Sequence, residues 1–289
     1  MADPLLSTLT LPAPAKINHF LHITGRRADG YHLLQTLFQF LNYCDEITLT
    51  LREDGVISRS QGGEGIPEQD DLVVKAAKLL QTETACRLGA DIKVLKRLPM
   101  GGGLGGGSSD AATTLLGLNL LWGLGLSEQS LAATGLRLGA DVPVFIYGRA
   151  AWAEGVGEQL EFVGLDEKCY LVVHPGVHVS TAKIFASEGL TRDLRPITIA
   201  TFLAGQTQNV FESVVRKAYP EVDNAFRWLS GFAVVKMTGS GACLFAEFDS
   251  EGQARQVLNK LPEQWSGFVA LSDSISPLHK KLDNIVKTV

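Results

Sequence analysis

The sequence predicts an α+β protein built from two domains, and three observations support this prediction. The chain has 289 residues, more than one domain commonly holds. Up to residue 160, stretches with strand periodicity are mixed with stretches of helical spacing. Beyond that point, several short helices come before two strands that flank a glycine turn. We therefore expect one domain over residues 1–160 and a second over residues 161–289.

The first domain is expected to begin with strands. In "KINHFLHITG", Lys16–Gly25, an apolar run ends at a glycine, and a turn follows at Asp29-Gly30. "DEITLTL" alternates Ile47, Leu49 and Leu51 on one face, as a half-buried strand does. Residues 72–81 repeat apolar positions at helical spacing. A further strand is expected in "ADIKVLKRLP", residues 90–99.

Two more helices complete this domain. We predict a helix over Ala111–Trp122, because Ser108, Ser109 and Asp110 are good N-terminal capping residues. Gly123 is a natural stop for it. Ser127 is expected to cap the next helix, which should end near residue 139.

The second domain is expected to be an antiparallel sheet covered by helices. Its apolar run "CYLVVHPG" is typical of a buried strand, and "FAVVKMTGSGACLFAEF" indicates two strands around Gly239-Ser240-Gly241. A last strand is expected in "GFVALSDS". Helices are predicted over residues 198–203, 209–218, 221–229 and 250–261.

Composition excludes several classes of protein. With 45% hydrophobic and 20% charged residues the chain is globular, and its net charge of -5 disfavours nucleic-acid binding. The four cysteines are far apart and form no C-x-x-C pair, which is typical of a reducing compartment. The opening "MADPLLSTLTLPAPAK" lacks the basic region of a signal peptide, and no apolar stretch is long enough to span a bilayer. We expect a cytoplasmic protein without a membrane partner.

The glycine-rich stretch "LPMGGGLGGGSSDAA", Leu98–Ala112, is the strongest functional signal. A strand is expected before this stretch and a helix after it. Its N–H groups would therefore lie at the positive end of a helix dipole, a position that favours binding of a phosphate. A mobile surface loop is the plain alternative. The G-x-G-x-x-G pattern of dinucleotide sites is also present in Gly101, Gly103 and Gly106. However, its acidic residue would be Glu128, which is expected at the start of a helix rather than after a strand.

Two other phosphate-binding motifs fit less well. A Walker A loop would need lysine where Ser108 stands, so nothing would reach the β- and γ-phosphates. The protein-kinase motifs H-R-D and D-F-G are missing from the sequence.

The stretch "PMGGGLGGGSSDAA" resembles the phosphate loop of the galactokinase, homoserine kinase, mevalonate kinase and phosphomevalonate kinase (GHMP) superfamily. "PAPAKINHFL" is similar to the N-terminal motif of this superfamily, and "MTGSGACLF" to its C-terminal glycine loop. The resemblance implies a ribosomal protein S5 domain 2-like N-terminal domain and a ferredoxin-like C-terminal domain. It also implies ATP and Mg²⁺ as cofactors. The magnesium-ligating glutamate of several relatives has no counterpart that we can place, so the metal ligands stay unassigned.

"GRRADGYHLLQTLFQFL" and "LGADVPVF" narrow the resemblance to members whose acceptor carries a cytidine diphosphate and serves isoprenoid precursor synthesis. For these, the resemblance implies that Asp141 accepts the hydroxyl proton and that Lys16 lies beside it. A nearby ammonium keeps a carboxylate ionised and stabilises charge on the reacting oxygen. The plain alternatives are a helix cap for Asp141, since Pro143 suits a first helical turn, and an exposed side chain for Lys16.

The resemblance also implies how ATP is held. The backbone of the glycine loop and Ser108 would bind the phosphates, while Ser109 would cap the helix, and either hydroxyl could meet the metal. Lys96 and Arg97 come just before the loop, and one of them could reach the nucleotide; two solvated charges are the alternative. The expected ATP-binding residues are Lys96, Pro99, Met100, Gly101, Gly102, Gly103, Leu104, Gly105, Gly106, Gly107, Ser108 and Ser109.

For the cytosine ring, the resemblance places Tyr31 on one face and His32 at the edge. Phe185 could close the other face, although ordinary core packing is the alternative for a phenylalanine. Asn18 shares a strand face with Lys16 and could orient the acceptor. The turn Gly239, Ser240, Gly241 and Ala242 is expected to bind the diphosphate, or else to form a tight hairpin.

The sequence thus favours a small-molecule kinase that is a monomer or weak homodimer, and three rivals remain. A kinase acting on mevalonate or homoserine would not need aromatic residues around a base. A dinucleotide-dependent oxidoreductase would bind NAD in place of ATP. A nucleotide-binding module without turnover would have no use for Lys16 and Asp141.

Overall fold

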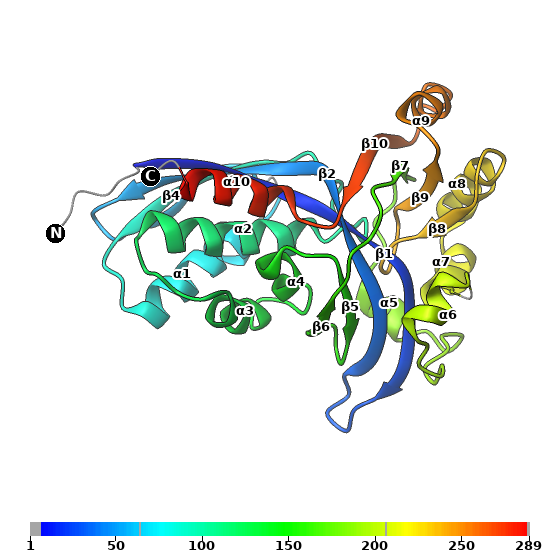
Figure 1. Ribbon diagram of the computed structural model, residues 1–289, viewed down its shortest axis with the longest axis horizontal. Coiled ribbons are helices and arrows are strands. Elements are labelled where there is room, and N and C mark those ends of the chain that lie inside the picture. The colour runs from blue at the N-terminus through cyan, green and yellow to red at the C-terminus, as the bar shows by residue number, and fades with distance from the viewer. Residues whose placement is uncertain (1–6, 64, 206, 288–289) are drawn as a thin grey trace.

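The computed structural model describes residues 7–63, 65–205 and 207–287. Part of the opening segment that disfavours a signal peptide, residues 1–6, lies outside these ranges. Two long antiparallel strands, β1 (Thr8–Arg26) and β2 (His32–Arg52), run through both halves of the molecule (Figure 1). Both extend well beyond the strands expected from the sequence. The alternation of Ile47 and Leu49 with threonines is confirmed, because both apolar side chains are fully buried.

One edge of β2 joins the two halves into a single ten-stranded sheet. It pairs in succession with β5 (Ala151–Glu154), β10 (Ser266–Asp273) and β4 (Gly89–Leu95), all antiparallel. Beyond β10 the order is β7 (Cys169–His174), β9 (Leu244–Phe248) and β8 (Val235–Met237), also antiparallel. The antiparallel sheet expected in the second half is therefore confirmed. The outer strands β3 (Ile57–Gln61) and β6 (Gln159–Phe162) pair with β4 and β5.

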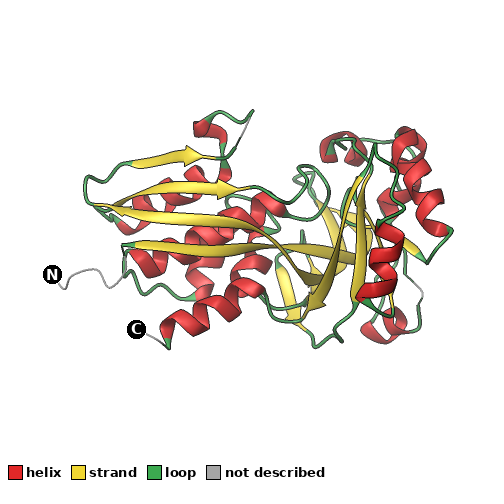
Figure 2. Cartoon of the chain, turned by 90° about the horizontal axis from the view of Figure 1, so that it is seen from above, coloured by secondary structure: helices red, strands yellow, loops and turns green. Residues whose placement is uncertain are grey.

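In the first half, the helices cover one face of the sheet (Figure 2). The most deeply buried is α2, whose side chains from Ser109 to Leu118 are all buried against the sheet and the neighbouring helices. Burial of apolar side chains between helices and sheet is the main stabilising contribution here. The helices of this half are η1 (Glu68–Asp70), α1 (Leu72–Thr84), α2 (Gly106–Leu121), α3 (Glu128–Leu136) and α4 (Val142–Tyr147).

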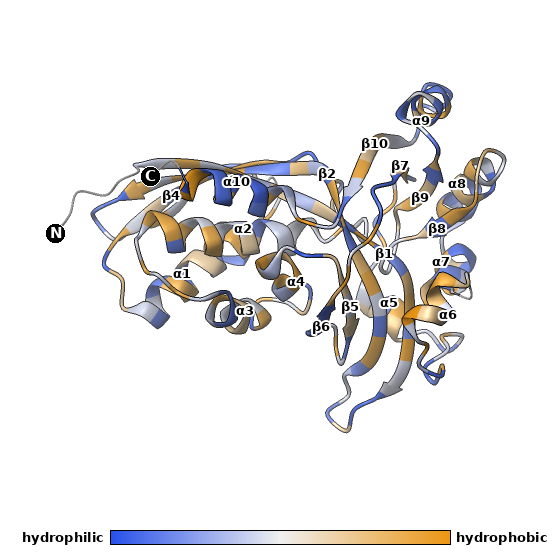
Figure 3. Cartoon of the chain, viewed as in Figure 1, coloured by the Kyte–Doolittle hydropathy of each residue, from blue (hydrophilic) through white to orange (hydrophobic). Residues whose placement is uncertain are grey.

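In the second half, the helices are shorter and more amphipathic, and Figure 3 shows much blue on α9 where α2 is mainly orange to white. They are α5 (Thr181–Phe185), α6 (Ile199–Leu203), α7 (Val210–Ala218), α8 (Pro220–Ser230) and α9 (Glu251–Leu258). Four of them agree with the sequence expectations to within a few residues, and α5 was not anticipated. Across residues 7–63, 65–205 and 207–287, no helix has the length and hydropathy that a membrane span requires.

The last helix, α10 (Pro277–Val286), returns to the first half, beside β1 (Figure 1). Its Leu278 is fully buried in the core formed by α1, α2 and the sheet, and Leu282 and Ile285 pack against that core. Sequence reasoning did not anticipate this helix. The division at residue 160 stays a prediction, and α10 contributes to the core of the first half although it follows the second in the chain.

His19 of β1 lies where the two halves meet and carries a pH-dependent share of the stability. Its ring meets Tyr170, Phe202 and Phe245 edge-on, and its Nε2 lies 2.7 Å from Gln39 Oε1. Burial lowers the pKa of His19 from 6.5 to about 4, because the charged imidazolium would lose its water. Folded His19 is therefore neutral near pH 5, whereas the unfolded chain binds a proton there.

We expect the free energy of unfolding to fall as the pH drops from 6.5 to 4. At about 1.4 kcal/mol per pH unit, His19 contributes a loss of about 3 kcal/mol at most. Urea unfolding at pH 7 and pH 4.5 measures this, and His19→Gln should lack that part of the loss. The exposed His178 supplies the control, since His178→Gln should retain the full dependence. Equal pH dependence of His19→Gln and the native chain would contradict the assignment.

Candidate active site

Lys16 is a buried lysine at the centre of the site. Its Nζ donates hydrogen bonds to Asn18 Oδ1 at 2.6 Å and to the Gly103 carbonyl at 2.9 Å, and it lies 3.4 Å from Asp141 Oδ2. Its side chain is only 3% exposed, so the alternative of an exposed lysine is wrong. A buried ammonium needs such partners to offset the loss of hydration.

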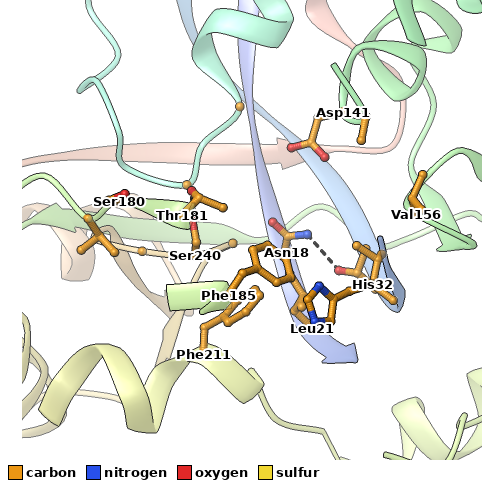
Figure 4. A pocket seen from close by; sticks show the side chains of 18 of the residues that line it. Asn18, Leu21, His32, Asp141, Val156, Ser180, Thr181, Phe185, Phe211 and Ser240 are labelled. Carbon is orange, nitrogen blue, oxygen red and sulfur yellow. Dashed lines mark hydrogen bonds between the residues drawn. The ribbon is translucent and has the colours of Figure 1, made fainter. Parts of the chain in front are cut away.

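Asp141 faces a cavity rather than capping a helix. It stands at the N-cap position of α4, but its side chain accepts no hydrogen bond from the helix. The side chain is 36% exposed, and the residue lines a cavity of about 900 Å³. In Figure 4 its carboxylate lies on the same side of Asn18 as the glycine-rich loop, away from the aromatic residues. The capping alternative is therefore not supported, and the carboxylate can meet a molecule in this cavity.

The glycine-rich loop separates two cavities. Gly101, Gly103 and Gly105 line both the 900 Å³ cavity, here called the front cavity, and a second one of about 730 Å³, the loop cavity. Of the expected ATP-binding residues, Lys96, Pro99, Met100, Gly102, Leu104, Gly106, Gly107 and Ser108 line the loop cavity alone. Ser109 is fully buried and lines neither cavity. The loop thus presents its backbone to both sides.

The helix after the loop starts earlier than the sequence suggested. Helix α2 begins at Gly106, and its N-cap is Gly105 in the left-handed conformation. The prediction that Ser108, Ser109 and Asp110 cap a helix starting at residue 111 is wrong, because these residues already lie inside the first turns. Consequently the free N–H groups of the first turn belong to Gly106, Gly107 and Ser108, and two of these three residues carry no side chain.

A second glycine turn fixes the loop from the other side. The N–H groups of Ala242 and Cys243 donate to the carbonyls of Gly101 (3.3 Å) and Gly102 (3.1 Å). The hydroxyl of Thr238 donates to the Gly103 carbonyl (3.2 Å) and accepts from the Asn18 N–H (3.0 Å). Thr238 was not anticipated, although it lies within "MTGSGACLF". Two segments 135 residues apart in the chain are therefore held in fixed register.

Lys96 is partly buried and forms ion pairs, so the alternative of a solvated charge is wrong for it. It pairs with Asp45 and, at 2.7 Å, with Asp110, while the buried Asp45 also accepts from the N–H groups of Arg97 (2.5 Å) and Leu98 (2.8 Å). Burial opposes the charge on Lys96, but the two carboxylates raise the pKa of its ammonium above the ordinary value. Burial also raises the pKa of Asp110. Asp45 was not anticipated from the sequence. Its carboxylate holds the backbone at Arg97 and Leu98, where the strand ends and the glycine loop begins. The one signal for it in the sequence is its place at the start of the apolar run "DEITLTL".

The aromatic residues meet at the far end of the front cavity. Tyr31 lies on the turn between β1 and β2 and is 65% exposed. The ring of His32 stacks on Phe185 at 4.8 Å, and Phe185 meets Phe211 edge-on at 4.9 Å. This differs from the expected arrangement, in which His32 and Phe185 contact different parts of the base. Burial, together with Arg26 and Arg192, lowers the pKa of His32, so its ring is neutral near pH 7.

The front cavity brings together most of the expected acceptor residues. Figure 4 shows Asn18 between Asp141 and the His32–Phe185 pair, with Ser240 and Thr181 to one side. The hydroxyls of Ser240 and Thr181 lie 2.7 Å apart, and Thr181 was not anticipated. The expected residues that line this cavity are Lys16, Asn18, Tyr31, His32, Asp141, Phe185, Gly239, Ser240 and Gly241.

Comparisons with known proteins agree with this architecture. The family model "GHMP kinases N terminal domain" matches residues 71–149, and "GHMP kinases C terminal" matches residues 187–267. A crystal structure of homoserine kinase from Cytophaga hutchinsonii superimposes with a TM-score of 0.69 over 96% of this chain and 98% of that one, at 17% identity, which shows the shared fold. The chain belongs to the GHMP kinases, a class of small-molecule kinases, and the expected two-domain α+β architecture is confirmed.

Relatives of higher identity share one name. The chain is 58% identical to 4-diphosphocytidyl-2-C-methyl-D-erythritol kinase of Alkalilimnicola ehrlichii over 94% of this chain and 93% of that protein. It is 55% identical to the enzyme of that name from Nitrosococcus oceani, over 97% and 99%. A crystal structure of 4-(cytidine 5'-diphospho)-2C-methyl-D-erythritol kinase superimposes with a TM-score of 0.79 at 31% identity, covering 91% of this chain and 99% of that one. Within the GHMP kinases, the family is that of 4-diphosphocytidyl-2-C-methyl-D-erythritol kinase.

Membership of this family argues against the dinucleotide-dependent oxidoreductase. The structure gives a physical reason as well. Glu128 lies in the first turn of α3 and pairs with Arg149 at 3.5 Å, so it is not placed at the end of a strand to bind a ribose.

Proposed function

We propose that this chain transfers the terminal phosphoryl group of ATP to the 2-hydroxyl of 4-diphosphocytidyl-2-C-methyl-D-erythritol, a step of the non-mevalonate route to isoprenoid precursors. The observation that carries the proposal is the position of Lys16 and Asp141. They form an ion pair in the front cavity, directly against the loop whose other side lines the loop cavity. A donor on one side and an acceptor on the other would thus meet beside this pair.

In this mechanism Asp141 acts as the general base. Its carboxylate takes the proton of the acceptor hydroxyl as the oxygen attacks the terminal phosphorus, the new O–P bond forms, and the bond to the ADP oxygen breaks. The ammonium of Lys16 stabilises the negative charge that develops on the attacking oxygen. The hydrogen bond from Lys16 to the Gly103 carbonyl fixes that ammonium against the loop.

The loop cavity is the proposed site for ATP. The free N–H groups at the start of α2 and the bare backbone of the glycines suit a triphosphate. Lys96 lies on the same side, and its charge is shared with Asp45 and Asp110. Because Asp45 and Asp110 hold the ammonium, it cannot swing far, and we infer that it acts as a fixed charge.

Magnesium fits this side of the loop with few protein ligands. Of residues 7–63, 65–205 and 207–287, none form a group of three or more acidic, histidine or cysteine side chains suited to a metal. In phosphoryl transfer Mg²⁺ takes most of its ligands from water and phosphate, so one or two protein oxygens suffice. Asp110 Oδ1 and Ser109 Oγ are buried and have no hydrogen-bond partner, and Asp110 lines the loop cavity. Magnesium bound there would neutralise phosphate charge.

The aromatic end of the front cavity is the proposed site for cytosine. Tyr31, His32 and Phe185 line this end of the cavity and offer ring faces on which a base can stack. The turn Gly239–Gly241 lines the same cavity and lies against Gly103 of the glycine loop, a position that suits a diphosphate.

Substrate choice is tested by measuring ADP release with three acceptors in parallel: 4-diphosphocytidyl-2-C-methyl-D-erythritol, mevalonate and homoserine. We expect turnover with the cytidylyl compound alone, because neither of the others has a base to occupy the aromatic end. Turnover with mevalonate or homoserine instead would overturn the substrate assignment. Binding of ATP without turnover of any acceptor would favour a nucleotide-binding module.

A further inference from the structure

A third cavity, the rear cavity, of about 800 Å³, lies on the other side of α7 from the front cavity. Phe211 of α7 lines the front cavity, whereas its neighbours Val210 and Glu212 line the rear one. On β1, Asn18 faces the front and His19 the rear. The proposed kinase reaction uses no residue of the rear cavity. However, helix α7 and strand β1 contribute residues to both the front and the rear cavity.

The rear cavity has an excess of positive charge in a chain whose net charge is negative. Both of its acids are already paired: Asp223 with Arg216 (2.8 Å) and Arg227 (2.7 Å), and Glu212 with Arg216 (3.3 Å). The acids therefore cannot neutralise any further cation.

Two lysines of the rear cavity remain. In the part of the chain that the structure describes, the side chains of Lys217 and Lys236 form no ion pair and no hydrogen bond. Lys236 is half-buried, and Glu247, which attracts it, is itself paired with Lys168 at 2.9 Å. A partly buried ammonium without a close partner is unfavourable, so an anion near it would be stabilising.

The rest of the rear cavity is lined by polar side chains, such as Thr207, Gln208 and Ser213, together with a smaller apolar part. Phe202, Val210 and Val234 belong to this apolar part, and Val234 is 81% exposed although valine is usually buried. The combination of lysines with this apolar part suits an anion that carries a hydrocarbon or aromatic group rather than a bare inorganic ion.

Asn209 connects the rear cavity to the acceptor site. It lines the rear cavity, and its Oδ1 accepts the N–H of Phe211 at 3.0 Å. Its Nδ2 donates to the carbonyls of Met237 and Gly239, each at 2.8 Å. A molecule that shifts Asn209 would therefore move both Phe211 and the Gly239 turn, which line the front cavity.

We propose that the rear cavity binds a small phosphorylated molecule with an apolar group, held by Lys236 and the wall around Val234, and that its binding changes the affinity for the acceptor through Asn209. The binding part is independent of the proposed kinase reaction.

Binding is tested by calorimetry with phenyl phosphate, in the presence of saturating ADP and Mg²⁺ so that the glycine loop is filled. We expect one site, and Lys236→Gln should weaken it at least about tenfold, as loss of a charge-assisted hydrogen bond does. Lys78→Gln is the matched control, since Lys78 is exposed on α1 and lies outside the rear cavity, and it should bind as the native chain does. Val234→Ser should weaken phenyl phosphate but not inorganic phosphate. An absence of heat, or equal affinity in Lys236→Gln, would overturn the proposal.

The coupling is tested by the KM for the acceptor with and without phenyl phosphate. We expect a change of several-fold in the native chain and none in Lys236→Gln. Binding in the calorimeter with an unchanged KM would overturn the coupling through Asn209. A chain that binds phenyl phosphate but turns over no acceptor would contradict the proposed reaction and leave the rear site standing.

Discussion

Asp141→Asn should lower kcat by at least about a hundredfold, within the range of about 10²–10⁴ typical of a lost general base. The amide keeps the size of the side chain but cannot take the hydroxyl proton. The carboxylate makes no capping hydrogen bond to α4, but it pairs with the buried ammonium of Lys16, so we expect the free energy of unfolding to fall. Asn18 and the Gly103 carbonyl remain as partners of that ammonium, so the variant should still fold. The dissociation constant of a non-hydrolysable ATP analogue should stay close to the native value, since Asp141 lines the front cavity and not the loop cavity.

Asp29→Asn is the matched control. Asp29 is another carboxylate of the front cavity, and its partner is Arg27 rather than Lys16. Removing its charge should leave kcat near the native value. Steady-state kinetics and analogue titration of both variants separate the outcomes. If turnover survives in Asp141→Asn, the carboxylate is not the base; if nucleotide binding collapses as well, its role is structural.

Gly103→Ala is expected to raise the KM for ATP at least about tenfold and to lower kcat as well. Gly103 has a φ of +76°, and a Cβ there would lie 2.2 Å from the Thr238 carbonyl oxygen and 3.1 Å from that of Gly241. Backbone atoms cannot move aside as a flexible side chain can, so the two glycine segments must separate. The Gly103 carbonyl, which accepts from Lys16, would move with them. A shift of this kind changes the position of the ammonium and of the phosphate-binding backbone together.

Gly123→Ala distinguishes the close contact from the cost of the backbone conformation. Gly123 has a φ of +64°, but nothing lies within 4 Å of an added Cβ. It should lose only about 1–2 kcal/mol of stability, the usual cost of a left-handed non-glycine residue, and keep its kinetic constants. Urea unfolding and ATP kinetics of the two variants make the comparison. Native KM values in Gly103→Ala would show that the loop does not hold the triphosphate.

Periodicity and capping residues were sufficient to predict most elements of the fold. The helix at residues 72–84 and the strand at residues 89–95 are determined by their own apolar spacing, so the sequence was informative there. The start of α2 could not be predicted from propensity, because its first turns are glycines and serines that become helical only through packing against the sheet. Helix α10 was missed for a similar reason. Its apolar residues are buried only because they pack against a core that is formed by residues much earlier in the chain.

The candidate site divides in the same way. The glycine loop, Lys16 and Asp141 each lie in a short contiguous motif, so they could be recognised in the sequence. Their assigned roles remain predictions. The contacts of Asp45 and Thr238 depend on which segments the fold brings together across 50 to 220 residues of chain. The stacking of His32 on Phe185 likewise joins the first turn to a short helix that no periodicity indicated.

The return of α10 to the first half has a consequence for synthesis on the ribosome. The N-terminal core needs Leu278 to be complete, so a nascent chain that has emerged only to residue 160 exposes the apolar groove that α10 will fill. The N-terminal core therefore cannot be completed until the ribosome has translated α10. A chain that ends before Pro277 would expose that groove to chaperones and proteases.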